Sequence, residues 1–105
     1  MQLGYTILYV ADVEATLSFY ERAFGLTRRF LHESGLYGEL DTGATTLAFA
    51  GEAMAALNGA EIRPNRAAEP AAGFEVAFVT ADPAAAYATA LAAGATGVTP
   101  PSQKP

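Results

Sequence analysis

The chain has 105 residues, 51% of them hydrophobic, which is enough for one domain with a core and too short for two. Its 11 acidic and 6 basic residues give a formal charge of −5, which disfavours nucleic-acid binding because an acidic surface repels phosphates. The sequence contains no cysteine, which excludes disulfides, thiolate metal sites and cysteine nucleophiles.

The first predicted elements are a strand and a helix. Residues 5–10, YTILYV, are rich in β-branched and aromatic side chains and predict a strand. Asp12 predicts the start of a helix, because its side-chain oxygen can accept hydrogen bonds from the free N–H groups of the first turn. Apolar residues recur at helical spacing from Val13 to Phe24, and Gly25 predicts the end of the helix in the left-handed conformation.

Three more strands are predicted over residues 27–33, 36–41 and 45–50, separated by the turn signals Ser34-Gly35 and Thr42-Gly43. Connections this short predict an antiparallel meander, because parallel neighbours need long crossovers. Residues 1–50 are therefore expected to form one β-α-β-β-β unit.

An internal repeat follows a connector over residues 51–73, in which one or two helical turns are expected around residues 53–57. From residue 74 the sequence FEVAFVTADPAAAYATALAAG again predicts a strand, an Asp cap and a helix that ends at Gly. A shift of about 70 positions lays Asp12 on Asp82. The repeat predicts a second copy of the unit over residues 74–105.

The second copy is incomplete. After its helix, only residues 95–99 could form a strand, so by the logic of the repeat two strands are missing. Either the sequence is truncated or another chain supplies the missing strands. An unfinished sheet exposes unpaired backbone groups and favours pairing with a partner, and the expected partner is a second copy of the chain in a homodimer.

No targeting or membrane segment is expected. Strand-like sequence begins almost at once after Met1, without the basic and apolar regions of a signal peptide. The most apolar helical stretch, residues 84–93, is about half as long as a bilayer crossing requires. We therefore expect a cytoplasmic protein without membrane contact.

Three segments resemble the vicinal oxygen chelate superfamily, which groups glyoxalase I, extradiol dioxygenases, and fosfomycin- and bleomycin-resistance proteins. The segments are YTILYVADVEATLSFYERAFGL at residues 5–26, GELDTGATTLAF at 38–49 and FEVAFVTADPAAAYATALAAGA at 74–95. The resemblance implies a single α+β domain over residues 1–105. In it, two paired β-α-β-β-β units with curved mixed sheets surround a cavity, the second unit being incomplete.

The resemblance also bears on metal binding. Catalytic members of the superfamily generally bind a divalent metal through a His near the start of a unit's first strand and a Glu on its last strand. In this sequence Tyr5 and Glu75 stand at the two His positions, and Ala48 falls near the Glu position. A transition-metal site needs three or four converging donors. We therefore predict no cofactor and no metal ligands, a divalent metal being disfavoured.

Strand alternation predicts which side chains line the cavity. If Leu8 and Val10 pack under the helix, the alternate residues of both repeat strands face the opposite side. Together with the single histidine, this gives a predicted ligand-binding set of Tyr5, Ile7, Tyr9, Glu75, Ala77 and His32. Such a wall suits an organic ligand held mainly by stacking and burial.

Two of these residues have alternative interpretations. Glu75 could anchor a cationic ligand or act as a general base, or it could simply pair with Arg28, Arg29 or Arg63. His32, on the same strand face as Phe30, could take part in acid–base chemistry or be an exposed histidine near the turn.

Two functions are consistent with these residues, and a third possibility involves no ligand. The first is a metal-independent binding protein for a small drug or metabolite, of the bleomycin-resistance type. The alternative is a metal-dependent lyase, isomerase or dioxygenase of the glyoxalase type, so whether the protein is an enzyme stays open. The third is an interaction unit with a filled cavity. The expected partners are a small organic ligand and a second copy of the chain.

Overall fold

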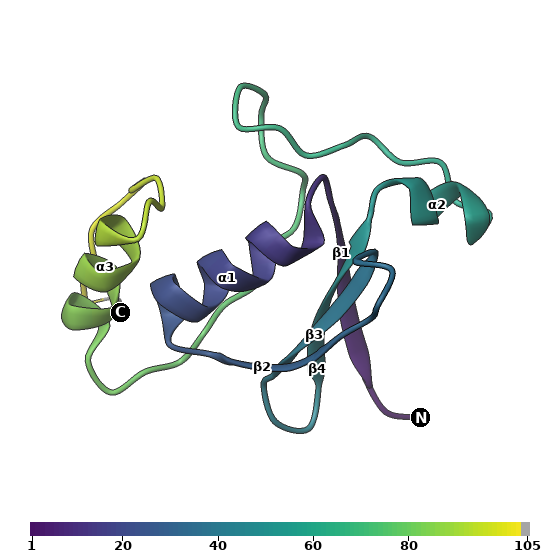
Figure 1. Ribbon diagram of the computed structural model, residues 1–105. Coiled ribbons are helices and arrows are strands. Elements are labelled where there is room, and N and C mark those ends of the chain that lie inside the picture. The colour runs from purple at the N-terminus through teal and green to yellow at the C-terminus, as the bar shows by residue number, and fades with distance from the viewer. Residues whose placement is uncertain (104–105) are drawn as a thin grey trace.

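The computed structural model describes residues 1–103 (Figure 1). Its elements are β1 (Tyr5–Val10), α1 (Val13–Phe24), β2 (Thr27–Leu31), β3 (Tyr37–Asp41), β4 (Thr46–Gly51), α2 (Ala53–Leu57) and α3 (Pro83–Ala92). The four strands form one sheet in the order β1-β4-β3-β2, with β1 parallel to β4 and the other neighbours antiparallel. This arrangement confirms the predicted β-α-β-β-β unit and its meander.

The ends of α1 follow from the predicted local signals. Asp12 accepts a hydrogen bond from the Ala15 N–H at 3.0 Å, which satisfies a backbone donor that the helix itself leaves free. Gly25 adopts a φ of 67° and donates its N–H to the Glu21 carbonyl at 3.0 Å. Both interactions confirm the bounds predicted from the sequence.

The hydrophobic core lies between α1 and one face of the sheet. The side chains of Leu17 from α1 and Phe49 from β4 are fully buried there. Leu8 and Val10 pack against the same cluster, which confirms the predicted inward face of β1. Figure 1 shows α1 along this face, whereas, within residues 1–103, α2 near one end is the one helix on the opposite face. The buried cluster consists of Val13, Leu17, Leu40, Leu47 and Phe49.

The strands expected at residues 74–79 and 95–99 are not formed. A strand needs a neighbouring backbone to pair with, and β1 finds one in β4. Among residues 1–103, the second half of the chain contains no equivalent of β4, so residues 74–79 run unpaired. This segment is held by side chains instead, with the Phe78 ring 5.0 Å from that of Phe24 on α1.

The helix of the second repeat is present as predicted. It begins at Pro83, and the side chain of Asp82 caps it by accepting a hydrogen bond from the Ala85 N–H at 3.1 Å. The fold class is therefore α+β, with one complete unit and an unclosed curved sheet. The last two residues of the expected second unit, 104 and 105, lie outside the described residues.

No helix within residues 1–103 combines the length and the apolar character that a membrane crossing requires.

Candidate functional site

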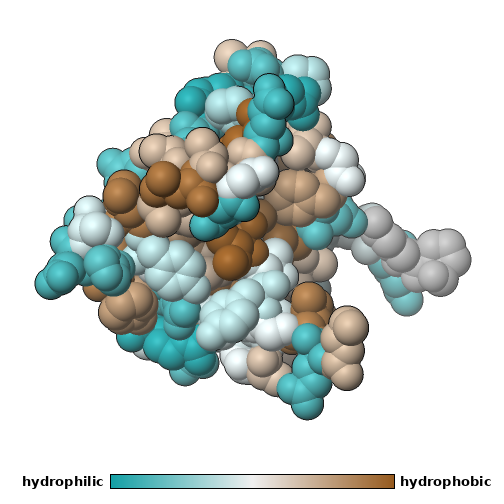
Figure 2. All heavy atoms as spheres, turned by 90° about the vertical axis from the view of Figure 1, so that its right-hand side faces the viewer, coloured by the Kyte–Doolittle hydropathy of each residue, from teal (hydrophilic) through white to brown (hydrophobic). Residues whose placement is uncertain are grey.

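The uncovered face of the sheet is the candidate site. Tyr5 and Ile7 of β1 lie on this face, opposite Thr46 and Ala48 of β4, and are 57% and 44% exposed. Ala48 in turn pairs with Glu39 of β3, so a row of side chains crosses three strands. Figure 2 views the molecule from the right-hand side of Figure 1, where pale ring-shaped side chains lie beside apolar residues.

A β-bulge directs Arg29 to the uncovered face. The register between β2 and β3 shifts between Arg28 and Phe30, which leaves Arg29 as the additional residue. Arg28 lies on the helix side, where its Nη2 is 2.8 Å from Glu21 Oε1. The two arginines therefore lie on opposite faces of the sheet, and each contacts a carboxylate.

A polar network occupies the middle of the uncovered face. The Tyr37 hydroxyl donates to Glu39 Oε2 at 2.7 Å, and Arg29 Nε lies 3.3 Å from Glu39 Oε1. Arg29 Nη2 also donates to the hydroxyl of Thr46. The Glu39 side chain is only 17% exposed, so these two partners replace most of the water that its carboxylate would otherwise bind.

Tyr37 remains a hydrogen-bond donor in this network. Burial raises the pKa of its phenol, and the hydrogen bond to Glu39 and the charge of that carboxylate raise the pKa further. The nearby Arg29 charge acts in the opposite direction but is the smallest contribution. The phenol is therefore protonated at neutral pH and holds Glu39 in place.

Aromatic rings border the network at the end of β2. The Phe30 ring centroid lies 6.4 Å from that of Tyr37 and 6.2 Å from that of His32. His32 thus shares a face with Phe30, as predicted. It is exposed, and its Nδ1 lies 2.7 Å from the Ser34 hydroxyl and accepts the Ser34 N–H at 3.0 Å. His32 therefore also shapes the turn, and its role in ligand binding stays a prediction.

Tyr9 lies at the end of the uncovered face that is next to α2. It is half-buried and pairs with Ala50 of β4, and its hydroxyl accepts a hydrogen bond from Asn58 Nδ2 at 3.3 Å. Asn58 follows α2 directly, so α2 and Tyr9 together limit the uncovered face on that side.

The structure does not bring Glu75 and Ala77 to Tyr5, contrary to prediction. Because residues 74–79 do not join the sheet, Ala77 lines a different groove of about 790 Å³ between α1 and α3, beside Phe24 and Phe78. Glu75 is exposed, and within residues 1–103 it forms no ion pair with any of the arginines considered as partners. The expected shared cavity is therefore not formed by this part of the chain.

The residues at the implied metal positions do not fit a metal. Tyr5 offers a neutral phenol, Ala48 has no donor atom, and Glu75 lies on the irregular segment away from both. Residues 1–103 contain no group of three or more His, Cys, Asp or Glu side chains placed to hold an ion. Glu39 lies directly across the strands from Ala48, but its carboxylate already contacts Arg29 and Tyr37. It therefore does not replace the missing metal ligand.

Sequence reasoning missed the polar network. Tyr37 and Glu39 alternate with Gly38 and Leu40 along a predicted strand, and this alternation alone would have placed the two polar side chains together on the face away from the core. Nothing in the sequence of β2 marks the bulge that turns Arg29 towards them.

The family model for the glyoxalase/bleomycin resistance protein/dioxygenase superfamily matches residues 2–105. The chain therefore belongs to that superfamily. No protein with a curated function matches the sequence.

The chain is similar to several solved structures of glyoxalase-family proteins. A glyoxalase/bleomycin resistance protein/dioxygenase family enzyme from Burkholderia phytofirmans is 21% identical with a TM-score of 0.72, over 99% of this chain and 82% of that one. A glyoxalase-related enzyme from Fulvimarina pelagi is 21% identical with a TM-score of 0.69, over 90% of this chain and 66% of that one. A lactoylglutathione lyase from Agrobacterium tumefaciens is 26% identical with a TM-score of 0.43, over 48% of this chain and 37% of its own length. The matched part of this chain thus spans between about a third and four fifths of these proteins.

Proposed function

We propose that the chain binds a small organic molecule on the uncovered face of its sheet, without a metal ion. Exposed apolar side chains on the same face as a fixed ion pair support this proposal. Tyr5, Ile7 and Phe30 are each 44% or more exposed, and all three lie on one face of the sheet. Phe30 lies beside Arg29 and Glu39. Tyr5 and Ile7 lie on β1, at the opposite edge of the same face. Apolar walls with a few fixed polar groups are typical of small-molecule sites.

A second copy of the chain is proposed as the partner that covers this face. Ligand sites usually bury about 70–90% of the surface of a small molecule, and a single open sheet buries less. The sheet of one chain is unclosed, and β1 and β2 are both edge strands. A dimer would supply the missing wall.

Binding is tested with naphthalene compounds that carry an acidic, neutral or basic group. At least one should raise the melting temperature and give a measurable heat of binding, because a ligand of the folded state stabilises it. Tyr5→Ala should weaken binding by about 3- to 10-fold, because the substitution removes one aromatic contact with the ligand. Phe74→Ala is the matched control: Phe74 is 53% exposed, similar to Tyr5, but lies on the segment that does not join the sheet.

Two results would contradict this function. The first is the absence of binding and of any shift in melting temperature with the whole panel. The second is a rise in melting temperature with Ni, Zn, Mn or Fe alone, which would favour the metal-dependent lyase, isomerase or dioxygenase instead.

A further inference from the structure

Arg29 is the polar group that the uncovered face offers to a ligand. Its side chain is 40% exposed, whereas that of Glu39 is 17% exposed. Within residues 1–103, Arg29 Nε faces Glu39, Nη2 donates to Thr46, and the N–H groups of Nη1 have no acceptor. Two neighbours hold the guanidinium in place, and its remaining N–H groups can still donate. Such a guanidinium is already oriented to bind an acceptor group of a ligand.

Glu39 is, by contrast, poorly placed to contact a ligand directly. Both of its oxygens are engaged, one by Arg29 and the other by the Tyr37 hydroxyl. Its contribution is to fix the position of Arg29 at the bulge. Asp41, the other acid on β3, is exposed at the strand end and forms no ion pair with Arg29 within residues 1–103. Solvent therefore screens its charge.

Flat rings lie around this guanidinium. Phe30 is the next residue along β2 and lies on the same face, with its ring 6.4 Å from that of Tyr37. Tyr5 pairs across the strands with Thr46, the residue that accepts from Arg29. The rings provide stacking surfaces, and the guanidinium provides a charged fork beside them.

We infer that the ligand is an aromatic carboxylate, whose ring stacks on the exposed Tyr5 and Phe30 and whose carboxylate accepts hydrogen bonds from Arg29. This inference rests on the proposed function. Carboxylates match the planar fork of a guanidinium better than a single carbonyl does. The preference for cationic ligands expected from Glu75 loses its basis, because Glu75 does not reach this face.

The experiment compares naphthoate, naphthamide and naphthylmethylamine by calorimetric titration against the complete chain. Wild-type protein should bind naphthoate at least about tenfold more tightly than naphthamide, and the amine most weakly. Arg29→Leu should abolish this preference while changing naphthamide binding by less than about threefold. Arg29→Lys, which keeps the charge but not the fork, should retain part of the preference. Arg22→Leu removes one positive charge from α1 and should leave all three affinities unchanged.

The outcomes separate this inference from the proposed function. One outcome is that naphthamide or the amine binds at least as tightly as naphthoate and that Tyr5→Ala weakens this binding. In that case the face binds small molecules, but the inference that its ligand is an aromatic carboxylate is wrong. Equal affinities of wild type and Arg29→Leu for naphthoate would also overturn the inference. If none of the three compounds binds the wild type, both the inference and the proposed function fail. Should Arg29→Leu not fold, Arg29→Lys gives the same comparison with a smaller expected loss.

Discussion

Phe49→Ala is expected to lower the free energy of unfolding by about 3–5 kcal/mol. The Phe49 side chain is fully buried, and its ring centroid lies 4.8 Å from that of Tyr20 on α1. The substitution removes most of a large apolar side chain from the centre of a small core and leaves a cavity. Urea unfolding followed by circular dichroism measures the change, provided that the slope of the transition stays constant.

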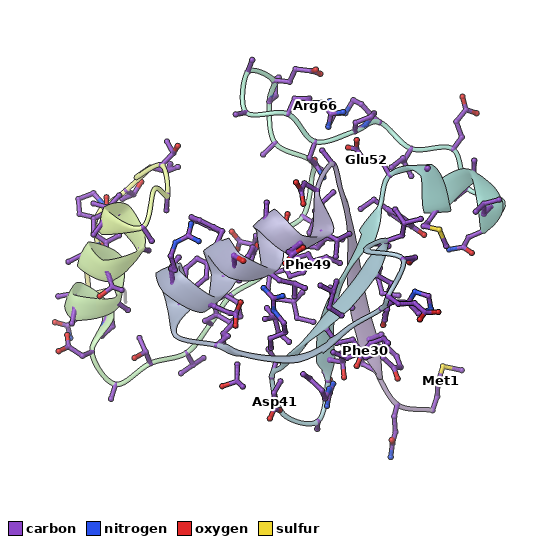
Figure 3. The ribbon with its side chains drawn as sticks, viewed as in Figure 1. Met1, Phe30, Asp41, Phe49, Glu52 and Arg66 are labelled. Carbon is purple, nitrogen blue, oxygen red and sulfur yellow. The ribbon has the colours of Figure 1, made fainter. Side chains whose placement is uncertain are left out.

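Phe30→Ala is the matched control for this substitution. Figure 3 shows Phe49 close to α1 and Phe30 on the side of the sheet away from the helix. Because Phe30 is 44% exposed, its loss should cost less than about 1 kcal/mol. Similar losses for the two variants would contradict the assignment of the core face and the open face.

Glu39→Leu is expected to cost about 1–2 kcal/mol of unfolding free energy. The substitution leaves the Tyr37 hydroxyl and the Arg29 guanidinium without the carboxylate that now satisfies them. The lower end of this range reflects the partial exposure of Arg29, because water compensates for part of the lost ion pair. Glu39→Gln is the control, since its amide oxygen can still accept from Tyr37, and it should cost less than Glu39→Leu.

The same network makes the free energy of unfolding depend on pH in the alkaline range. Burial first, and then Glu39, raise the pKa of Tyr37 above its ordinary value of 10.0. Folding therefore favours the protonated phenol, so this stabilisation is complete below about pH 10 and is lost as the pH rises further. Ultraviolet absorbance of phenolate should show Tyr37 ionising at a lower pH in Glu39→Gln, although burial still keeps its pKa raised. An unchanged Tyr37 titration in Glu39→Gln would contradict the contribution of the Glu39 charge to the raised pKa of Tyr37.

The first half of the fold could be predicted because its signals are local. Asp12 and Gly25 set the ends of α1 by hydrogen bonds to residues three and four positions away. The inward positions of Leu8 and Val10 follow from the period of a strand, which depends only on the order of residues. Short connections then determine the meander of β2, β3 and β4.

The second half could not be predicted in the same way. Residues 74–79 have the composition of a strand, but a strand exists only when another backbone pairs with it, and the sequence of the segment does not contain that information. The expected position of Glu75 and Ala77 beside Tyr5 depended on this pairing, and it is not found within residues 1–103. Their role in ligand binding stays a prediction.

The candidate site shows the corresponding limit for side chains. Alternation along β3 would have placed Tyr37 and Glu39 on the uncovered face, but the bulge at Arg29 changes the register of β2 by one residue. A shift of this kind depends on how two strands pair, so it becomes visible only in the structure. The predicted roles of Tyr5, Ile7, Tyr9 and His32 in ligand binding stay predictions.

An amide correlation spectrum recorded by nuclear magnetic resonance during a naphthoate titration tests most directly whether the uncovered face is the binding site. We predict that shifts concentrate on residues of β1 and β2 on this face, including Tyr5, Ile7 and Arg29. Shifts confined to the groove between α1 and α3, at Phe78 and Tyr87, would contradict binding at the uncovered face.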